Sequence, residues 1–300
     1  MYRYKRLLVG LNISDQDAKL IRFASLVSLM AESEQVTFVH VFRVPADMGN
    51  MDPDYEAMLQ AAVAELREDL ERVVNLYFGG PPEAEVRCEL IEGAPLTELL
   101  QMARTQDMDL ILVGKDRYGG TLAEKLARKA PCSVLIIPPN ARPSISKVLV
   151  PVDFSGHSTD AMDVAVAFAD AAGLTELHSL HVYSVPTGYF KAGMSYDEFA
   201  AVVCKYAKEY YEGFIKKIDL RSLAVIPHFV LEADIPQAVR KTVHEQEADL
   251  LVLGSRGRTN SAAVLLGSVT EKMIRTTDVP IVAVKKKGAN LSFLDALLQI

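Results

Sequence analysis

The chain has 300 residues, of which 50% are hydrophobic and 24% charged, a balance typical of a globular protein with room for two domains. The net charge is −7 and no basic run is longer than residues 285–287, which argues against a nucleic acid partner. The sequence has no apolar run near the ~18 residues of a membrane span and no signal-peptide pattern, so we expect a cytoplasmic protein without membrane contact.

An internal repeat organises the chain. Residues 6–45 match residues 147–186 at a constant offset without a gap, and each stretch contains an apolar run, a helical segment and a second apolar run. Further along, residues 109–114 match residues 249–254. The order of elements is therefore repeated as well, and the chain is predicted to contain two copies of one module.

The first copy is expected to occupy residues 1–140. A proline-rich connector, 138–144, then predicts an extended, turn-rich link to a second domain at 144–287. A tail, 288–300, remains, and its last ten residues are apolar enough for a short amphipathic helix that docks on this chain or on another.

Within each copy, short Val, Ile and Leu runs alternate with longer segments of 3.6-residue periodicity, which is the pattern of βαβ units and a parallel sheet. We therefore predict two tandem doubly wound, Rossmann-like α/β domains, each with a five-stranded, mainly parallel sheet covered by helices on both faces. The strands predicted for the second copy are 147–152, 176–183, 224–231, 249–253 and 280–284. The predicted helices are 158–172, 195–218, 235–246 and 268–276. An apolar stripe on the second of these helices is interpreted as core: Phe199, Val202, Val203, Tyr206, Tyr210 and Phe214.

Glycines at a fixed spacing follow the predicted strand 249–253. Gly254 and Gly257 are followed, after nine further residues, by Gly267. Glycine tolerates positive φ and lets the backbone approach a ligand, so consecutive N–H groups can turn toward phosphate oxygens. Arg256 adds a positive charge within the same loop.

Gly267 leads into a predicted helix whose first turn contains Ser268, Val269 and Thr270. Unpaired N–H groups and the positive end of the helix dipole favour an anion at such a position. The alternative is a capping box, in which Ser268 and Glu271 only satisfy the helix start. The spacing of the glycines upstream favours the binding site over the cap.

Asp153 follows the first strand of the second copy. In a doubly wound sheet, ligands bind beyond the carboxyl ends of the strands at the switch point, so this carboxylate is a candidate to accept hydrogen bonds from an adenine or a ribose. The alternative is an N-cap for the helix that follows. The first copy has Asn12 at the matching position, without the charge.

Taken together, these motifs resemble the ATP-binding branch of the universal stress protein family, and the resemblance covers nearly the whole chain twice. It implies that ATP or another adenine nucleotide binds the second copy, with or without Mg²⁺. The contacts implied for adenosine come from Pro151, Val152, Asp153 and the backbone of Val182. Those implied for ribose and phosphates come from Gly254, Ser255, Gly257, Gly267, Ser268, Val269 and Thr270.

The first copy departs from this pattern. Its corresponding loop is seven residues shorter, although Gly114, Gly119 and Gly120 are present. Arg117 and Ala123 stand where the second copy has Gly257 and Thr270. We therefore expect a degenerate, nucleotide-free first domain. The family also implies that the last strands of two modules pair, which makes the chain an intramolecular pseudo-dimer, or a homodimer of tandem chains.

Three functions stay open at this point. The first is a nucleotide-binding stress-response module that signals to an unidentified protein with little or no hydrolysis, since the chain lacks a Gly-Lys-Ser/Thr phosphate loop. The second is a slow ATPase or nucleotidyl-transfer enzyme, for which His157 is the lead. The third is a scaffold without nucleotide.

No metal site is expected. His40 and His181 occupy matching strand positions, which favours a role in the core for both. The other histidines considered, and the cysteines, are scattered along the chain without the spacing of metal ligands: His178, His228, His244, Cys88, Cys132 and Cys204.

Overall fold

The computed structural model describes residues 3–44, 53–115, 121–257 and 266–289. The chain divides into two compact units, which are described separately here. The first consists of the chain up to Ser144 together with the segment from Lys287 onward, and the second runs from Ile145 to Lys286. The predicted tail helix lies outside the described residues.

The first unit is a five-stranded sheet with the strand order β3-β2-β1-β4-β5, and its neighbouring strands are parallel. The elements are β1 Arg6–Leu11, α1 Asp17–Ala31, β2 Gln35–Phe42, α2 Pro53–Tyr77, β3 Glu85–Glu92, α3 Pro95–Thr105, β4 Leu110–Gly114, α4 Thr121–Lys129 and β5 Ser133–Ile137.

The second unit repeats this topology with the parallel order β8-β7-β6-β9-β10. The elements are β6 Val148–Pro151, α5 Gly156–Ala171, β7 Glu176–Tyr183, the 3₁₀ turn η1 Tyr189–Ala192, α6 Tyr196–Ile215, β8 Ala224–Leu231, α7 Ile235–Glu245, β9 Leu250–Gly254, α8 Ser268–Thr276 and β10 Ile281–Val284. The predicted fold class is confirmed, and the observed ends lie within a few residues of the predicted ones.

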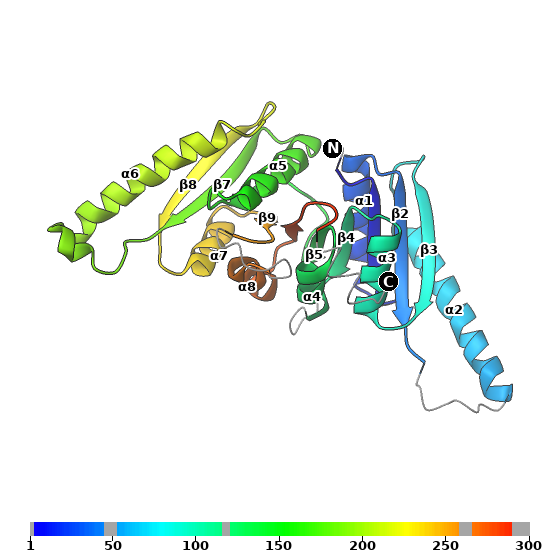
Figure 1. The fold of residues 1–300 in the computed structure, drawn as a ribbon. Coiled ribbons are helices and arrows are strands. Elements are labelled where there is room, and N and C mark those ends of the chain that lie inside the picture. The colour runs from blue at the N-terminus through cyan, green and yellow to red at the C-terminus, as the bar shows by residue number, and fades with distance from the viewer. Residues whose placement is uncertain (1–2, 45–52, 116–120, 258–265, 290–300) are drawn as a thin grey trace. The chain divides into compact units, whose positions relative to one another are not determined.

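The core of each unit lies on both faces of its central strands. In the second unit α5 and α6 cover one face of the sheet, and α7 and α8 cover the other (Figure 1). The run from Leu250 to Leu253 is buried on both sides as a result. This explains why the central strands are continuous apolar runs and do not alternate with polar residues.

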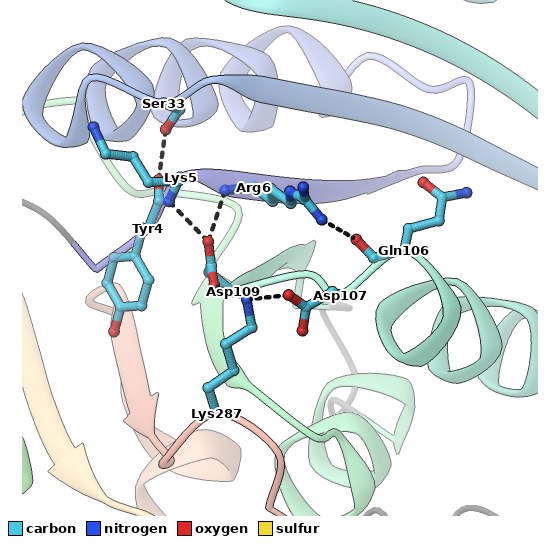
Figure 2. Close-up of polar contacts among 8 residues, drawn as sticks. All are labelled: Tyr4, Lys5, Arg6, Ser33, Gln106, Asp107, Asp109 and Lys287. Atoms are coloured by element: carbon cyan, nitrogen blue, oxygen red, sulfur yellow. Dashed lines mark hydrogen bonds and ion pairs between the residues drawn. The ribbon is translucent and has the colours of Figure 1, made fainter.

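A carboxylate before the fourth strand of each unit anchors the first strand. Asp109 accepts hydrogen bonds from the backbone N–H groups of Lys5 and Arg6 at 2.9 and 2.8 Å (Figure 2). Its other oxygen lies 2.8 Å from the ammonium of Lys287, which also contacts Asp107 at 2.7 Å. The segment that follows the second unit is thereby tied to the first unit by a two-carboxylate ion pair.

Asp249 does the same work in the second unit, where it accepts from the N–H groups of Ser146 at 2.9 Å and Lys147 at 2.9 Å. The Asp at this position is therefore a structural feature of the module.

The predicted core stripe on α6 is wrong in part. Phe214 is buried, but Tyr206 and Tyr210 are 55% and 68% exposed. The face turned toward the sheet instead contains small residues together with Tyr211 and Phe214. Helical periodicity identifies an apolar stripe, but it does not decide which of two stripes on one helix meets the sheet.

Candidate functional site

The predicted site residues of the second unit gather where the strand order reverses. The strands β6 and β9 are neighbours, with Val148 opposite Leu250 and Leu149 opposite Leu251, and they run parallel. Their carboxyl ends therefore bring Pro151, Val152 and Asp153 to the same edge as the glycine loop. This is the position at which open α/β sheets bind ligands.

Two hydrogen bonds close the base of the glycine loop. The N–H of Gly267 donates to the carbonyl of Ser255 at 2.8 Å, and the hydroxyl of Thr270 donates to the carbonyl of Gly254 at 2.8 Å. The buried side chains of Ser255 and Thr270 lie beneath this bend. The residues that flank the loop are thus held together, while residues 258–265 lie outside the described part of the chain.

The glycines of this loop serve close approach and not unusual dihedral angles. Gly267 has a φ of −63°, and neither Gly254 nor Gly257 has a positive φ. A methyl group on Gly254 would stand 2.8 Å from the backbone carbonyl oxygen of His157, in the first turn of α5. The expected positive φ is therefore wrong, and the approach of these glycines to a ligand stays a prediction.

Helix α8 begins without a side-chain cap. Its N-cap is Gly267, and Ser268 is already the first helical residue, so the capping-box interpretation is wrong. The N–H groups of Ser268, Val269 and Thr270 have no acceptor among the described residues. By contrast, α5, α6 and α7 of the same unit are capped by the side chains of Ser155, Ser195 and Asp234. The start of α8 therefore presents free donors and a positive dipole end to the loop.

Asp153 fastens the turn between β6 and α5. Its Oδ1 accepts from the N–H and the hydroxyl of Ser155 at 3.0 and 2.6 Å, and from the hydroxyl of Ser158 at 2.5 Å. The N-cap of α5 is Ser155, so Asp153 is not the cap. Its Oδ2 lies 3.1 Å from the place that a methyl group on Gly257 would occupy. The carboxylate thus faces the loop as predicted, although one of its oxygens already accepts three hydrogen bonds.

Sequence reasoning missed the aromatic side chain next to this carboxylate. Phe154 has a φ of +67° and stacks on the ring of His181 with centroids 4.2 Å apart. His181 is buried, and its Nδ1 lies 2.9 Å from the carbonyl oxygen of Val152. The polar spacing Asp153, Ser155, Ser158 was the available signal for a tight turn here, because Asp side chains bind N–H groups two residues on.

The remaining predicted site residues lie on β6, on β7 and in the glycine loop. Val182 follows His181 on β7 and is half-buried, and Pro151 pairs with Leu180 in the sheet. Arg256 is half-buried in the loop. In the first unit, His40 contacts the carbonyl of Leu11 through Nδ1 at 3.0 Å, as His181 contacts Val152. Both matching histidines therefore contact the end of a first strand. The prediction of a core position is confirmed for His181, whereas His40 is only half-buried.

The matching place in the first unit is a small pocket of about 30 Å³ between the ends of β1 and β4. This is room for one or two water molecules. Asp17, on α1, accepts from the N–H groups of Asn12 and Ser14 at 3.3 and 3.0 Å. The ammonium of Lys19 donates to the carbonyl of Pro139 at the rim of the pocket. Gly119 and Gly120 lie outside the described residues.

Two histidines that looked scattered in the sequence are in contact. Nδ1 of His178 lies 3.0 Å from Nε2 of His228, because β7 and β8 are neighbouring strands. Burial lowers the pKa of His228, and the nearby His178 lowers it further. In the described part of the chain, no group of three or more potential metal ligands occurs, and no helix is both long and apolar enough to span a membrane.

The fold and the site define a class of protein: a duplicated, doubly wound parallel α/β module. Proteins of this class bind ligands at the carboxyl ends of the strands, where the strand order reverses. The model of the universal stress protein family matches residues 3–138 and again residues 144–285. The chain therefore belongs to the universal stress protein family, with two tandem domains.

Individual relatives agree with this assignment. A universal stress protein of Mycobacterium tuberculosis strain H37Rv is 27% identical over 219 residues, which cover 69% of this chain and 70% of that protein. One of Methanocaldococcus jannaschii is 27% identical over 157 residues, which cover 48% of this chain and 96% of that protein. The crystal structure of a universal stress protein from Archaeoglobus fulgidus covers 94% of this chain and 96% of its own, with a TM-score of 0.65 at 18% identity.

Proposed function

We propose that the second unit binds an adenine nucleotide, with ATP as the first candidate, and acts as a regulatory module with little or no hydrolysis. The observation that supports this most directly is the start of α8. A glycine N-cap follows a loop whose two ends are hydrogen-bonded together, and the next three N–H groups, of Ser268, Val269 and Thr270, have no acceptor in the part of the chain that the structure describes. A helix start of this kind favours a phosphate group.

The residues present fit the two ends of a nucleotide. The N–H groups at the start of α8, with the exposed hydroxyl of Ser268, would hold phosphate oxygens. Asp153 and the strand ends at Pro151 and Val182 would meet the adenosine end, where a carboxylate accepts hydrogen bonds from hydroxyl or amino groups. Because Asp153 faces Gly257, an occupied site would join the turn after β6 to the loop after β9.

Regulation follows from this connection. A ligand that contacts both segments shifts the population of their relative arrangements by its differential affinity for them. The described loop residues contribute no lysine of the phosphate-loop type, and Oδ1 of Asp153 already accepts three hydrogen bonds. Both features favour binding over turnover, and the altered turn of the first unit, in which Asp17 takes up the N–H groups of Asn12 and Ser14, favours a nucleotide-free partner domain.

A slow ATPase is the second candidate, because one observation favours it. The carbonyl oxygen and Cβ of His157 lie 2.8 and 3.1 Å from the position of a methyl group on Gly254, so this histidine stands beside the loop. Phosphate release by the wild type that is lost in His157→Ala would support catalysis. Equal release by both proteins would exclude a role for this residue in turnover.

The binding test compares one glycine of each unit. Mass spectrometry of the material released from denatured, purified protein is expected to show one adenine nucleotide per chain. Titration calorimetry with ATP is expected to show one site that is lost in Gly267→Val, since the branched side chain fills the space beside the unpaired N–H groups.

Gly114→Val is the matched control, because no atom lies within 4 Å of a methyl group added there. It is expected to bind like the wild type. Unchanged binding in Gly267→Val, or no binding of ATP by the wild type at millimolar concentration, would overturn the proposal. Circular dichroism spectra establish that each variant is folded.

A further inference from the structure

Helix α6 has a second apolar face beside the one that is buried against its own unit. Phe199, Val202, Tyr206 and Tyr210 follow one another at intervals of three and four residues, so they share one side of the helix. Tyr206 and Tyr210 are mostly exposed, whereas Ala207 and Tyr211, each one position further on and therefore about 100° around the helix, are buried. We call this row, in which Phe199 is half-buried and Val202, Tyr206 and Tyr210 are exposed, the aromatic stripe.

The 3₁₀ turn η1 extends the aromatic stripe at the start of α6. Tyr189 packs edge-to-face against Tyr196 and Phe199, with ring centroids 5.5 and 6.3 Å apart. Phe190, next to it, is 66% exposed. Rings that are held in place by one another lose little freedom on binding, and aromatic side chains are enriched in protein interfaces.

The corresponding helix of the first unit shows no such row over residues 56–77, whose side chains the structure describes. Over residues 61–68 its exposed side chains are alanines and charged residues, and within 56–77 the exposed large apolar residues are Met58 and Leu76. Over these described residues the aromatic stripe of α6 is therefore not repeated in the first unit. A cluster of exposed aromatic residues on one helix face marks an interaction surface.

We propose that the aromatic stripe pairs with the aromatic stripe of a second copy of this chain, with the two α6 helices antiparallel. The charges beside the stripe favour a second copy in the antiparallel direction. Glu198, Lys205, Glu209 and Lys216 are exposed and recur at intervals of seven, four and seven residues, so they follow one edge of the stripe.

An antiparallel pair centred near residue 207 places each of these charges opposite its complement. Glu198 then faces Lys216 of the partner subunit. The ion pair that Lys205 and Glu209 form within one helix at 3.9 Å faces the same pair of the partner subunit with the charges in opposite order. In a parallel pair the charged edges of the two helices would lie on opposite sides of the interface, so these complementary charges would not meet. A two-fold axis makes the arrangement self-complementary, so one helix supplies both halves of the interface. The interface lies on α6 and η1, and it is independent of the proposed nucleotide site.

Sedimentation equilibrium of the full chain tests the surface. The wild type is expected to form dimers in the micromolar range, and Tyr206→Glu with Tyr210→Glu is expected to weaken the association by about 100-fold or more, as interface tyrosines do. Met58→Glu, on the exposed part of α2, is the matched control and should leave the dimer intact. A wild type that stays monomeric at about 100 μM would overturn the proposal, and so would a dimer that the double variant does not weaken.

Cross-linking tests the antiparallel direction. With a helical rise of about 1.5 Å per residue, two copies of position 206 lie about 3 Å apart along the axis, and two copies of position 199 about 24 Å apart. In a Cys204→Ser background, a short bismaleimide is expected to join Tyr206→Cys chains and to leave Phe199→Cys chains unjoined. Joining of Phe199→Cys as readily as Tyr206→Cys would overturn the antiparallel arrangement.

Discussion

Replacing Gly254 by alanine is expected to destabilise the second unit, because the added methyl group has no room. It would stand 2.8 Å from the carbonyl oxygen of His157 and 3.1 Å from both the carbonyl carbon and Cβ of the same residue. The obstacle is mainly backbone in the first turn of α5, so it cannot rotate away. Either the helix start or the end of β9 must shift.

The expected cost follows from this contact. Overpacking by one methyl group in a tightly packed place typically costs about 1–3 kcal/mol. For a unit of this size, each kcal/mol lowers the melting temperature by roughly 2–4 °C. The matched change in the first unit, Gly114→Ala, meets no atom within 4 Å and is expected to be neutral or to stabilise by about 0.4–1 kcal/mol.

Differential scanning calorimetry of the two variants measures this difference, and hydrogen exchange locates it. We expect faster exchange in α5 and β9 of Gly254→Ala and unchanged exchange in β4 of Gly114→Ala. Because the chain has two units, the transitions are fitted separately and not as one two-state event. Equal melting temperatures for the two variants would refute the argument that His157 closes the space beside Gly254.

Three further outcomes are expected. Burial and the neighbouring His178 lower the pKa of His228, so below pH 6.5 the unfolded chain binds more protons than the folded chain. The free energy of unfolding should therefore fall as the pH drops from 7 to 5, by at most about 1.4 kcal/mol per pH unit, and urea titrations should show a smaller slope for His228→Gln. Asp109→Ala should destabilise the first unit by about 1–3 kcal/mol, because two backbone N–H groups lose their acceptor. Lys287→Met removes only a half-exposed ion pair and should cost less than about 1 kcal/mol, so a larger loss for Lys287→Met in calorimetry would contradict the role of Asp109 as the anchor of β1. Ser195→Ala should remove the capping box of α6 and cost about 1 kcal/mol, with fraying of the first turn visible by hydrogen exchange, and unchanged protection there would count against it.

The sequence predicted those parts of the fold that depend on regular patterns. Continuous apolar runs identified the strands, and the duplicated order of elements identified two modules before any contact was known. The choice between the two apolar sides of α6 could not be made in the same way. Periodicity records that Tyr206 and Tyr211 are both apolar, whereas only the packing against the sheet decides that Tyr211 is inside.

The candidate site was predictable where spacing along the chain fixes geometry. Asp153 and the glycine loop meet because the carboxyl ends of neighbouring parallel strands meet. Contacts between strands that are distant in sequence were missed, as with His178 and His228, which come together only through the register of β7 and β8. The start of α8 at Ser268 was predicted correctly, but the sequence alone left a capping box open, because Ser268 fits a capping sequence as well as a first helical turn.

The turn after the first strand of each unit contains a bulky residue with positive φ, Ile13 at +53° and Phe154 at +67°. A side chain pays a conformational penalty there, and both units retain it although only one has the carboxylate ahead of it. The carboxylate that accepts hydrogen bonds from this turn stands before the turn in the second unit, as Asp153, and after it in the first unit, as Asp17. The two units thus share the path of the main chain at this bend but place its carboxylate at different positions, so replacing Asn12 by Asp and Asp17 by Ser would give the first unit the charge arrangement of the second.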